Sequence, residues 1–498
     1  MSLIAISGFS FWFVIAFPWA NHNESYGLVV QLEQLSFADT VTSILYPTPT
    51  FRPLTQMVTY GLYMIFGHSL SGAQLFNFLT AALAWATLLH GVRDKSTFSL
   101  VAFWVGGFLF PGYIYLFHLH GVCYSPILLF IGVLFHFSDQ PLTTMAICAT
   151  FLLTLIFGLF HTLAFGLYVA FIAGSVIAQR KRFTSRQLGL LTTFCVLCIA
   201  LMRVLLSGYE NPMGLVHSGT FTQHIASFRM LEVHWSIAIA CLMLTLFTLL
   251  TMRLTKVETV GFSALIIATS VVSFYLSIPI VIIWIGITLV KAIVKQEWPI
   301  AFMLTASSLF ALTRHGSPTH ALFAVMIASA VAAEGWTADA KLKFAWSRLS
   351  LSIIVAVFSV GFALRCGYHV PVLSNLAHPI LAEKEKTFQL EKLISMVVAS
   401  EYKDYHIAFT SPAATPREAE DAVDRKHRPP TQEEYINAYL FYLCSGKTLC
   451  KDYQRNMTNR LLITFGSQML PKQRSVFTVE AKFAGRAAVW APFLDKNP

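Results

Sequence analysis

The stretch TMAICATFLLTLIFGLFHTLAFGLYVAFIAGSVIAQRKRFTSR, residues 144–186, decides the fold class of the chain. It covers two apolar runs, predicted as membrane spans over 143–158 and 162–179, and ends in a basic block. A helix needs about 20 such residues to cross a hydrocarbon core roughly 30 Å thick. Similar runs recur from residue 3 to about residue 366, and 56% of all residues are hydrophobic whereas 12% are charged. These features predict a mainly α-helical, polytopic transmembrane bundle.

The apolar runs predict thirteen membrane spans with the N-terminus in the cytoplasm. In this orientation the basic clusters, such as QRKRFTSR at 179–186 and Lys291 with Lys295, fall in cytoplasmic turns, as the positive-inside rule requires. An odd number of spans places the C-terminus outside the cytoplasm. We expect a multi-pass protein of the plasma membrane, or bacterial inner membrane. The predicted spans are 3–19, 71–92, 98–117, 122–137, 143–158, 162–179, 188–207, 235–252, 260–276, 278–294, 299–313, 319–335 and 346–366.

Charged residues become dense after residue 366, because residues 367–498 hold 17 Lys and Arg and 14 Asp and Glu. We therefore expect a transmembrane domain, 1–366, and a small extracytoplasmic α/β domain, 367–498. In the second domain EKEKTFQLEKLISMVVAS and RPPTQEEYINAYLFYL predict helices, and HIAFTS, RLLITFG and SVFTVEAKF predict strands. The spacing CSGKTLC fits a disulfide between Cys444 and Cys450 in an oxidising compartment.

The formal net charge of +10 does not indicate nucleic-acid binding, because the basic residues lie in short clusters between the spans. The predicted orientation instead singles out basic residues on the outer face, where the positive-inside rule does not favour them. Each is either a functional cation or a residue that caps a helix end or reaches to a lipid headgroup. These residues are Arg52, Arg203, Arg229 and Arg314.

The first outer loop, residues 20–70, is too long for a simple connector. It contains NESYG, with Glu24, near its start and the Arg-Pro motif TFRPL, with Arg52, further along. The segment LTQMVTYGLYMIF, residues 54–66, has apolar positions at helical spacing. It predicts a helix that lies in the membrane interface, either with a functional role or as a plain anchor.

NESYG, TFRPL and MIFG, in this order before the second span, resemble the first outer loop of the GT-C glycosyltransferases. These are membrane enzymes that depend on polyprenyl-phosphate sugars and include the protein O-mannosyltransferases. The segment ALTRHGSPTHAL, with Arg314 and His315, is similar to an Arg-aromatic-x-x-Pro pattern of the same family. The resemblance implies inverting transfer of a sugar from a polyprenyl- or dolichyl-phosphate donor to a glycan, lipid or protein outside the cytoplasm.

Two positions depart from the family pattern. Asn23-Glu24 stands where the family commonly has paired acids, and His161-Thr162 stands where some members have a basic residue followed by Glu. The first departure leaves one base in this part of the loop, and the second removes an acid that could bind a metal. We therefore expect that these residues form no metal site. The alternative is that the enzyme uses a divalent cation.

Glycosyl transfer needs a base that takes the proton of the acceptor hydroxyl. Glu24, at the exit of the first span, is the expected base; the alternatives are an interfacial carboxylate without a catalytic role and a metal ligand. Asp39 is the reserve candidate for the base. For Asp39, however, the favoured interpretation is the N-cap of a helix that begins at Thr40.

The transfer also needs cations that hold the phosphate as it leaves. Arg52 and Arg314 are the best candidates, because a guanidinium binds phosphate oxygens through two parallel hydrogen bonds and keeps its charge. Arg52 could instead lock the loop by pairing with Glu24. Arg203 is a weaker candidate, and His315 follows Arg314 directly.

Several rings on the predicted outer face are candidate substrate contacts, because neutral imidazoles and phenols bond to phosphate and sugar hydroxyls. They are Tyr26, His118, His120 and His161. Packing or water-linked roles are the alternative for each histidine.

The expected partners are thus a polyprenyl- or dolichyl-phosphate sugar, membrane lipids and an extracytoplasmic acceptor, and not nucleic acid. Two other functions stay open. A glycan polymerase or ligase that uses lipid-diphosphate glycans would depend on outer Arg and His residues and would not require Glu24. A transporter or flippase is disfavoured by the large C-terminal domain and by the scarcity of acidic residues within the spans.

Overall fold

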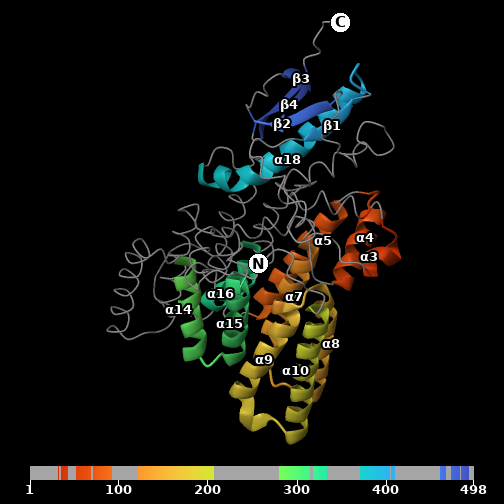
Figure 1. Cartoon of the computed structure of the whole chain (residues 1–498). Coiled ribbons are helices and arrows are strands. Elements are labelled where there is room, and N and C mark those ends of the chain that lie inside the picture. Colours follow the sequence, from red (N-terminus) through yellow and green to blue (C-terminus); the bar gives the residue numbers. More distant parts are fainter. Residues whose placement is uncertain are drawn as a thin grey trace, which may run out of the picture. The chain divides into compact units, whose positions relative to one another are not determined.

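A computed structural model gives the fold of the chain (Figure 1). It describes residues 32, 35–42, 52–68, 71–91, 121–138, 140–206, 280–313, 318–333, 371–403, 405–409, 460–466, 473–482 and 484–492. This part of the chain is mainly helical, with a small β-sheet near the C-terminus. It divides into two compact units: helices α4 to α16 belong to the first, and the sheet, α18 beyond Leu376 and the short helix α3 belong to the second. The domain boundary expected between residues 366 and 367 stays a prediction.

The first unit is a helix bundle in which the apolar runs of the sequence form the helices. Every predicted span within the described residues coincides with a helix to within a few residues at each end. The predicted spans 3–19, 98–117, 235–252, 260–276 and 346–366 lie outside the described residues. The helices are α4 (Pro53–Ile65), α5 (Ser71–Gly91), α7 (Gly121–Phe137), α8 (Thr144–Phe160), α9 (Leu163–Gln179), α10 (Ser185–Leu206), α14 (Ile280–Val294), α15 (Trp298–Thr313) and α16 (Pro318–Ala333), with a 3₁₀ turn, η2 (Arg180–Arg182), between α9 and α10.

Helix α5 combines buried polar side chains with exposed apolar ones. On α5, Gln74 and Asn77 are buried, whereas Leu79 and Leu83 are more than half exposed. The buried amide of Asn77 accepts a hydrogen bond from the Ser125 hydroxyl of α7, 3.1 Å away. Water does not favour such an arrangement, but lipid does, because lipid takes the apolar surface and leaves polar groups to pair within the bundle.

Two of the described helices are long and apolar enough to cross a membrane, and they are consecutive: Leu163–Arg182 and Ser185–Leu206. The second leaves most of its apolar surface uncovered, with Val196 and Val204 about 60% or more exposed. The remaining apolar helices of the bundle are shorter and are 122–137, 144–160, 281–294, 298–312 and 320–331.

Small residues let the helices approach closely. A Cβ added at Gly174 of α9 would lie 2.4 Å from the carbonyl oxygen of Trp298, at the start of α15. A Cβ at Gly132 of α7 would lie 3.0 Å from the Ala84 carbonyl oxygen of α5. Because the obstacle in each case is backbone, a larger side chain would force the helices apart.

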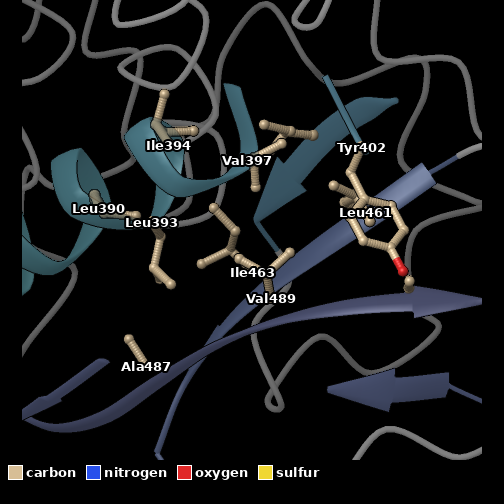
Figure 2. Close-up of a cluster of buried hydrophobic side chains, with 11 residues drawn as sticks. Leu390, Leu393, Ile394, Val397, Tyr402, Leu461, Ile463, Ala487 and Val489 are labelled. Carbon is tan, nitrogen blue, oxygen red and sulfur yellow. The ribbon is translucent and has the colours of Figure 1, made fainter. Parts of the chain in front are cut away.

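The second unit contains α18 (Pro371–Val398), whose residues beyond Leu376 pack on a four-stranded mixed sheet. Its strands are β1 (His406–Phe409), β2 (Arg460–Phe465), β3 (Gln473–Ala481) and β4 (Gly485–Pro492). Their order is β1-β2-β4-β3, with β1 parallel to β2 and the other pairs antiparallel. Figure 2 shows Leu390, Leu393 and Val397 of α18 against Ile463 and Val489 of the sheet, which form the core.

The predicted helix and strands of this unit are confirmed, except that the sequence analysis missed β4.

A polar residue ties the helix to the β3–β4 hairpin. The buried amide of Gln389 donates hydrogen bonds to the carbonyls of Val479, 3.0 Å away, and Gly485, 2.7 Å away. The predicted helix at RPPTQEEYINAYLFYL and the predicted Cys444–Cys450 disulfide lie outside the described residues.

Candidate functional site

A buried arginine stands at the start of α4 in the first unit. Arg52 precedes Pro53 with φ −134° and ψ 72°, so the helix begins directly after it. Arg52 is 8% exposed. Its Nη1 donates a hydrogen bond to Sγ of Cys123, 3.1 Å away in the first turn of α7. Arg52 and Cys123 are 71 positions apart in the sequence, so this contact is made by the packing of α4 against α7.

Among the residues that the structure describes, the hydrogen-bond partner of Arg52 is a neutral thiol. A thiol is neutral and is a weak hydrogen-bond acceptor. Within the described part of the chain, no carboxylate lies at ion-pair distance from Arg52, and the predicted pairing partner Glu24 falls outside that part. A buried guanidinium without a counter-charge is costly, and a bound anion would offset this cost.

Three helix ends and one helix junction bring together four aromatic rings, and one of them, Tyr124, follows Cys123 in the sequence. Tyr124, next to Cys123 in α7, packs against His161 and His320 with ring centroids 5.5 and 5.7 Å apart. Phe310 of α15 makes edge-on contacts with both histidines, at 5.5 Å to His161 and 5.2 Å to His320. The Tyr124 hydroxyl lies 3.3 Å from Nε2 of His320.

His161 terminates α8 and is 2% exposed. Its Nδ1 accepts a hydrogen bond from the backbone N–H of Leu163, 3.0 Å away, which fixes the neutral tautomer with the proton on Nε2. The same junction is tied to α4, because the Thr55 hydroxyl donates to the carbonyl of Phe160 at 3.0 Å. Arg52 and the rings are therefore joined twice, through Cys123–Tyr124 and through Thr55–Phe160. We call Arg52, Cys123, Tyr124, His161, Phe310 and His320 the Arg52 cluster.

The opposite end of α9 has a different character. Arg180, Lys181 and Arg182 form the η2 turn, and Arg186 follows in α10; all four are exposed. We call these four residues the basic turn. Lys291 was predicted to lie in a cytoplasmic turn. The structure instead places it within the last turn of α14, where it is fully buried.

Comparison with protein-family models and with curated proteins gave no match. A solved structure is similar. It is the crystal structure of ArnT from Cupriavidus metallidurans bound to undecaprenyl phosphate, with 12% sequence identity and a TM-score of 0.48. The similarity covers 100% of this chain and 98% of that chain.

The structure brings together two of the predicted site residues, Arg52 and His161. Arg203 lies exposed in the last turn of α10. The other predicted site residues lie outside the described residues, and their roles stay predictions. They are Glu24, Tyr26, His118, His120, Arg314 and His315.

The expected N-cap role of Asp39 is wrong. Helix α3 runs from Phe37 to Thr42, so Asp39 lies in its first turn and not before it. Ser36 takes the capping position: its hydroxyl oxygen accepts from the Asp39 N–H at 3.2 Å and donates to the Asp39 carboxylate at 2.6 Å. The serine three positions before the acid was the signal for this reciprocal cap.

The sequence analysis did not select Cys123, Tyr124, Phe310 or His320 for the site. Cys123 and Tyr124 follow the two histidines within FHLHGVCYSP, and His320 lies within the segment ALTRHGSPTHAL. The signal that could have selected Cys123, Tyr124 and His320 was their position near the starts of predicted spans, which became α7 and α16. Among the residues that the structure describes, no group of three His, Cys, Asp or Glu is placed to hold a metal ion.

Proposed function

We propose that the chain is an integral-membrane glycosyltransferase of GT-C type. It transfers a sugar from a polyprenyl- or dolichyl-phosphate donor to an acceptor outside the cytoplasm. The apolar side chains exposed on the bundle support the membrane location, and the motifs NESYG, TFRPL and ALTRHGSPTHAL support the family. Arg52 carries the proposal, because it is a buried guanidinium whose described hydrogen-bond partner is a neutral thiol.

Arg52 binds the donor phosphate in this proposal. A phosphate oxygen replaces the weak thiol acceptor and gives the buried cation a counter-charge. His161 supports this role, because its tautomer presents an Nε2–H donor and cannot accept at that nitrogen. A cation and a fixed donor at one helix junction suit a leaving group that gains negative charge during the reaction.

Glu24 is the proposed base. It takes the proton of the acceptor hydroxyl while the acceptor oxygen attacks the anomeric carbon and the lipid phosphate leaves from the opposite face. Such a single displacement inverts the anomeric configuration. NESYG and TFRPL belong to the same predicted outer loop, residues 20–70.

A glycan polymerase or ligase is the second candidate, and the gathering of Arg52 with His161 and His320 favours it equally. The two functions differ in donor and in base. The polymerase or ligase takes a lipid-diphosphate glycan and does not require Glu24, whereas the first candidate takes a lipid monophosphate sugar and requires it.

The lipid that co-purifies with the full chain tests the proposal. Mass spectrometry of the extracted lipid is expected to identify a polyprenyl or dolichyl phosphate, with or without its sugar. Arg52→Gln is expected to lose this lipid, and Arg186→Gln in the exposed basic turn is the matched control that retains it. A lipid diphosphate would favour the second candidate, and equal retention by both variants would contradict the role of Arg52.

A further inference from the structure

The ring of His320 is held by side chains from two neighbouring helices. The Tyr124 hydroxyl lies 3.3 Å from Nε2, and the two ring planes are nearly perpendicular, at 87°. Phe310 packs edge-on to the same ring at a centroid distance of 5.2 Å. A ring fixed in this way keeps its nitrogens in a constant direction, which a group that exchanges a proton with a bound ligand needs.

The two histidines of the Arg52 cluster differ in what their partners allow. The partner of His161 is a backbone N–H, which can only donate, so protonation of Nδ1 would break that bond. The partner of His320 is a hydroxyl, which donates to a neutral imidazole and accepts from an imidazolium. His320 therefore keeps its hydrogen bond to Tyr124 in both charge states, whereas His161 does not keep its bond to Leu163.

We propose that His320 gives a proton to the lipid phosphate as it leaves the sugar, and that Tyr124 is the residue that positions His320. This inference rests on the proposed function. His320 enters the step as an imidazolium that donates through Nε2 to the Tyr124 oxygen, and its Nδ1 proton is the one transferred. His161 is a fixed donor to the same phosphate and does not change its charge.

The step balances in atoms and charge. The bond between the anomeric carbon and the phosphate oxygen breaks, and its electron pair goes to that oxygen. The acceptor oxygen bonds to the same carbon and gives its proton to Glu24. The phosphate oxygen takes the proton of His320, so the lipid phosphate leaves as a monoanion and the total charge of the site is unchanged.

A protonated His320 and the Arg52 guanidinium are both cations, and a bound phosphate supplies a counter-charge to them. The other described titratable groups on the elements around α16 lie on α7, at the α8–α9 junction and on α14. They are Cys123, Tyr124 and His136 of α7, His161, and Lys291, with His136 and Lys291 in the last turns of their helices. The contact from α15 is the apolar Phe310.

Proton uptake on binding of undecaprenyl phosphate tests the inference. The purified full chain in detergent is titrated with this lipid by calorimetry near pH 7, in two buffers that differ in protonation enthalpy. Wild type is expected to take up more protons on binding than His320→Gln. As the pH rises, the affinity of wild type should therefore fall more steeply than that of the variant, by up to about tenfold more per pH unit. The ligand's own titration appears in both proteins and cancels in the difference.

Three variants complete the test. Tyr124→Phe keeps the ring but removes the hydroxyl, and we expect it to reduce the proton uptake. His161→Gln is expected to bind more weakly with the uptake of wild type, and His136→Gln, in α7 outside the cluster, to match wild type in both. Equal uptake in wild type, His320→Gln and Tyr124→Phe would overturn the inference alone. Absence of binding to wild type would instead overturn the proposed function on which it rests.

Discussion

The two ends of α9 place positive charge in opposite environments. The basic turn holds four exposed cations, each of which water can solvate. At the other end Arg52 is buried against a thiol, whereas Arg203, in the last turn of α10, is exposed. Exposed charges cost little and carry information about membrane orientation, whereas a buried charge persists only where something offsets its desolvation. The comparison separates cations that orient the chain from a cation that is suited to a ligand.

The histidines repeat this contrast. His90 and His136 stack at 5.5 Å near the ends of α5 and α7, where His90 is exposed and His136 contacts the amide of Gln140. His161 and His320 instead share one phenylalanine and one tyrosine within the bundle. The second pair is thus held between a phenylalanine and a tyrosine from neighbouring helices.

Glu24→Gln is expected to have the largest effect, because it removes the proposed base while the cations stay. Transfer from a lipid-phosphate sugar should be abolished, whereas expression, membrane insertion and binding of undecaprenyl phosphate should stay at the level of wild type. The measurements are a purified transfer assay and a lipid-binding titration. Retained transfer would remove Glu24 from the mechanism.

Arg52→Gln and Arg186→Gln test the difference between the two ends of α9 most directly, because each variant removes one positive charge from one end. We expect the first to lower transfer by roughly 10²- to 10³-fold, the range found when one donor to a developing anion is removed. The second should leave transfer within about twofold of wild type, because an exposed cation contributes little. Initial rates at saturating donor measure both, and similar losses in the two variants would contradict the assignment.

Gly174→Leu is expected to weaken the packing of α9 against α15. The new side chain meets the backbone of Trp298 and Pro299, which cannot move aside as a flexible side chain would. Overpacking of this kind costs about 1–3 kcal/mol, which a thermal-unfolding assay in detergent detects as a lower midpoint. Gly189→Leu in α10, where a Cβ meets nothing within 4 Å, is the control and should leave the midpoint unchanged.

The combined replacement of Arg180, Lys181 and Arg182 by Gln should have the smallest effect. Exposed substitutions change stability by less than about 0.5 kcal/mol each, and these residues are remote from the Arg52 cluster along α9. Thermal unfolding and transfer rate should both match wild type. A loss of transfer with unchanged stability would show that the basic turn also contributes to function.

The sequence predicted the helices of the bundle well, because an apolar run of the right length has no other stable form in lipid. Strand β4 was missed because GRAAVWAP is rich in alanine, and its strand form depends on pairing with β2 and β3 on both sides. Local pattern does not contain that information.

The Arg52 cluster could be predicted only in part, for the same reason. Arg52 was selected as an outer-face cation in the motif TFRPL, and His161 as a ring between two predicted spans. The contacts of Arg52 with Cys123, and of Tyr124 with His320 across 196 positions, depend on which helices become neighbours. Residue types at helix ends therefore gave candidates, and tertiary packing decided which of them meet.

The Gln389 amide has a consequence for how the second unit comes apart. Because one side chain of α18 is bonded to carbonyls on both arms of the β3–β4 hairpin, the arms cannot separate while the helix stays docked. Losing the helix would also leave those groups to be hydrated at once. Helix and hairpin should therefore unfold in a single cooperative step, with equal protection of their amides from hydrogen exchange.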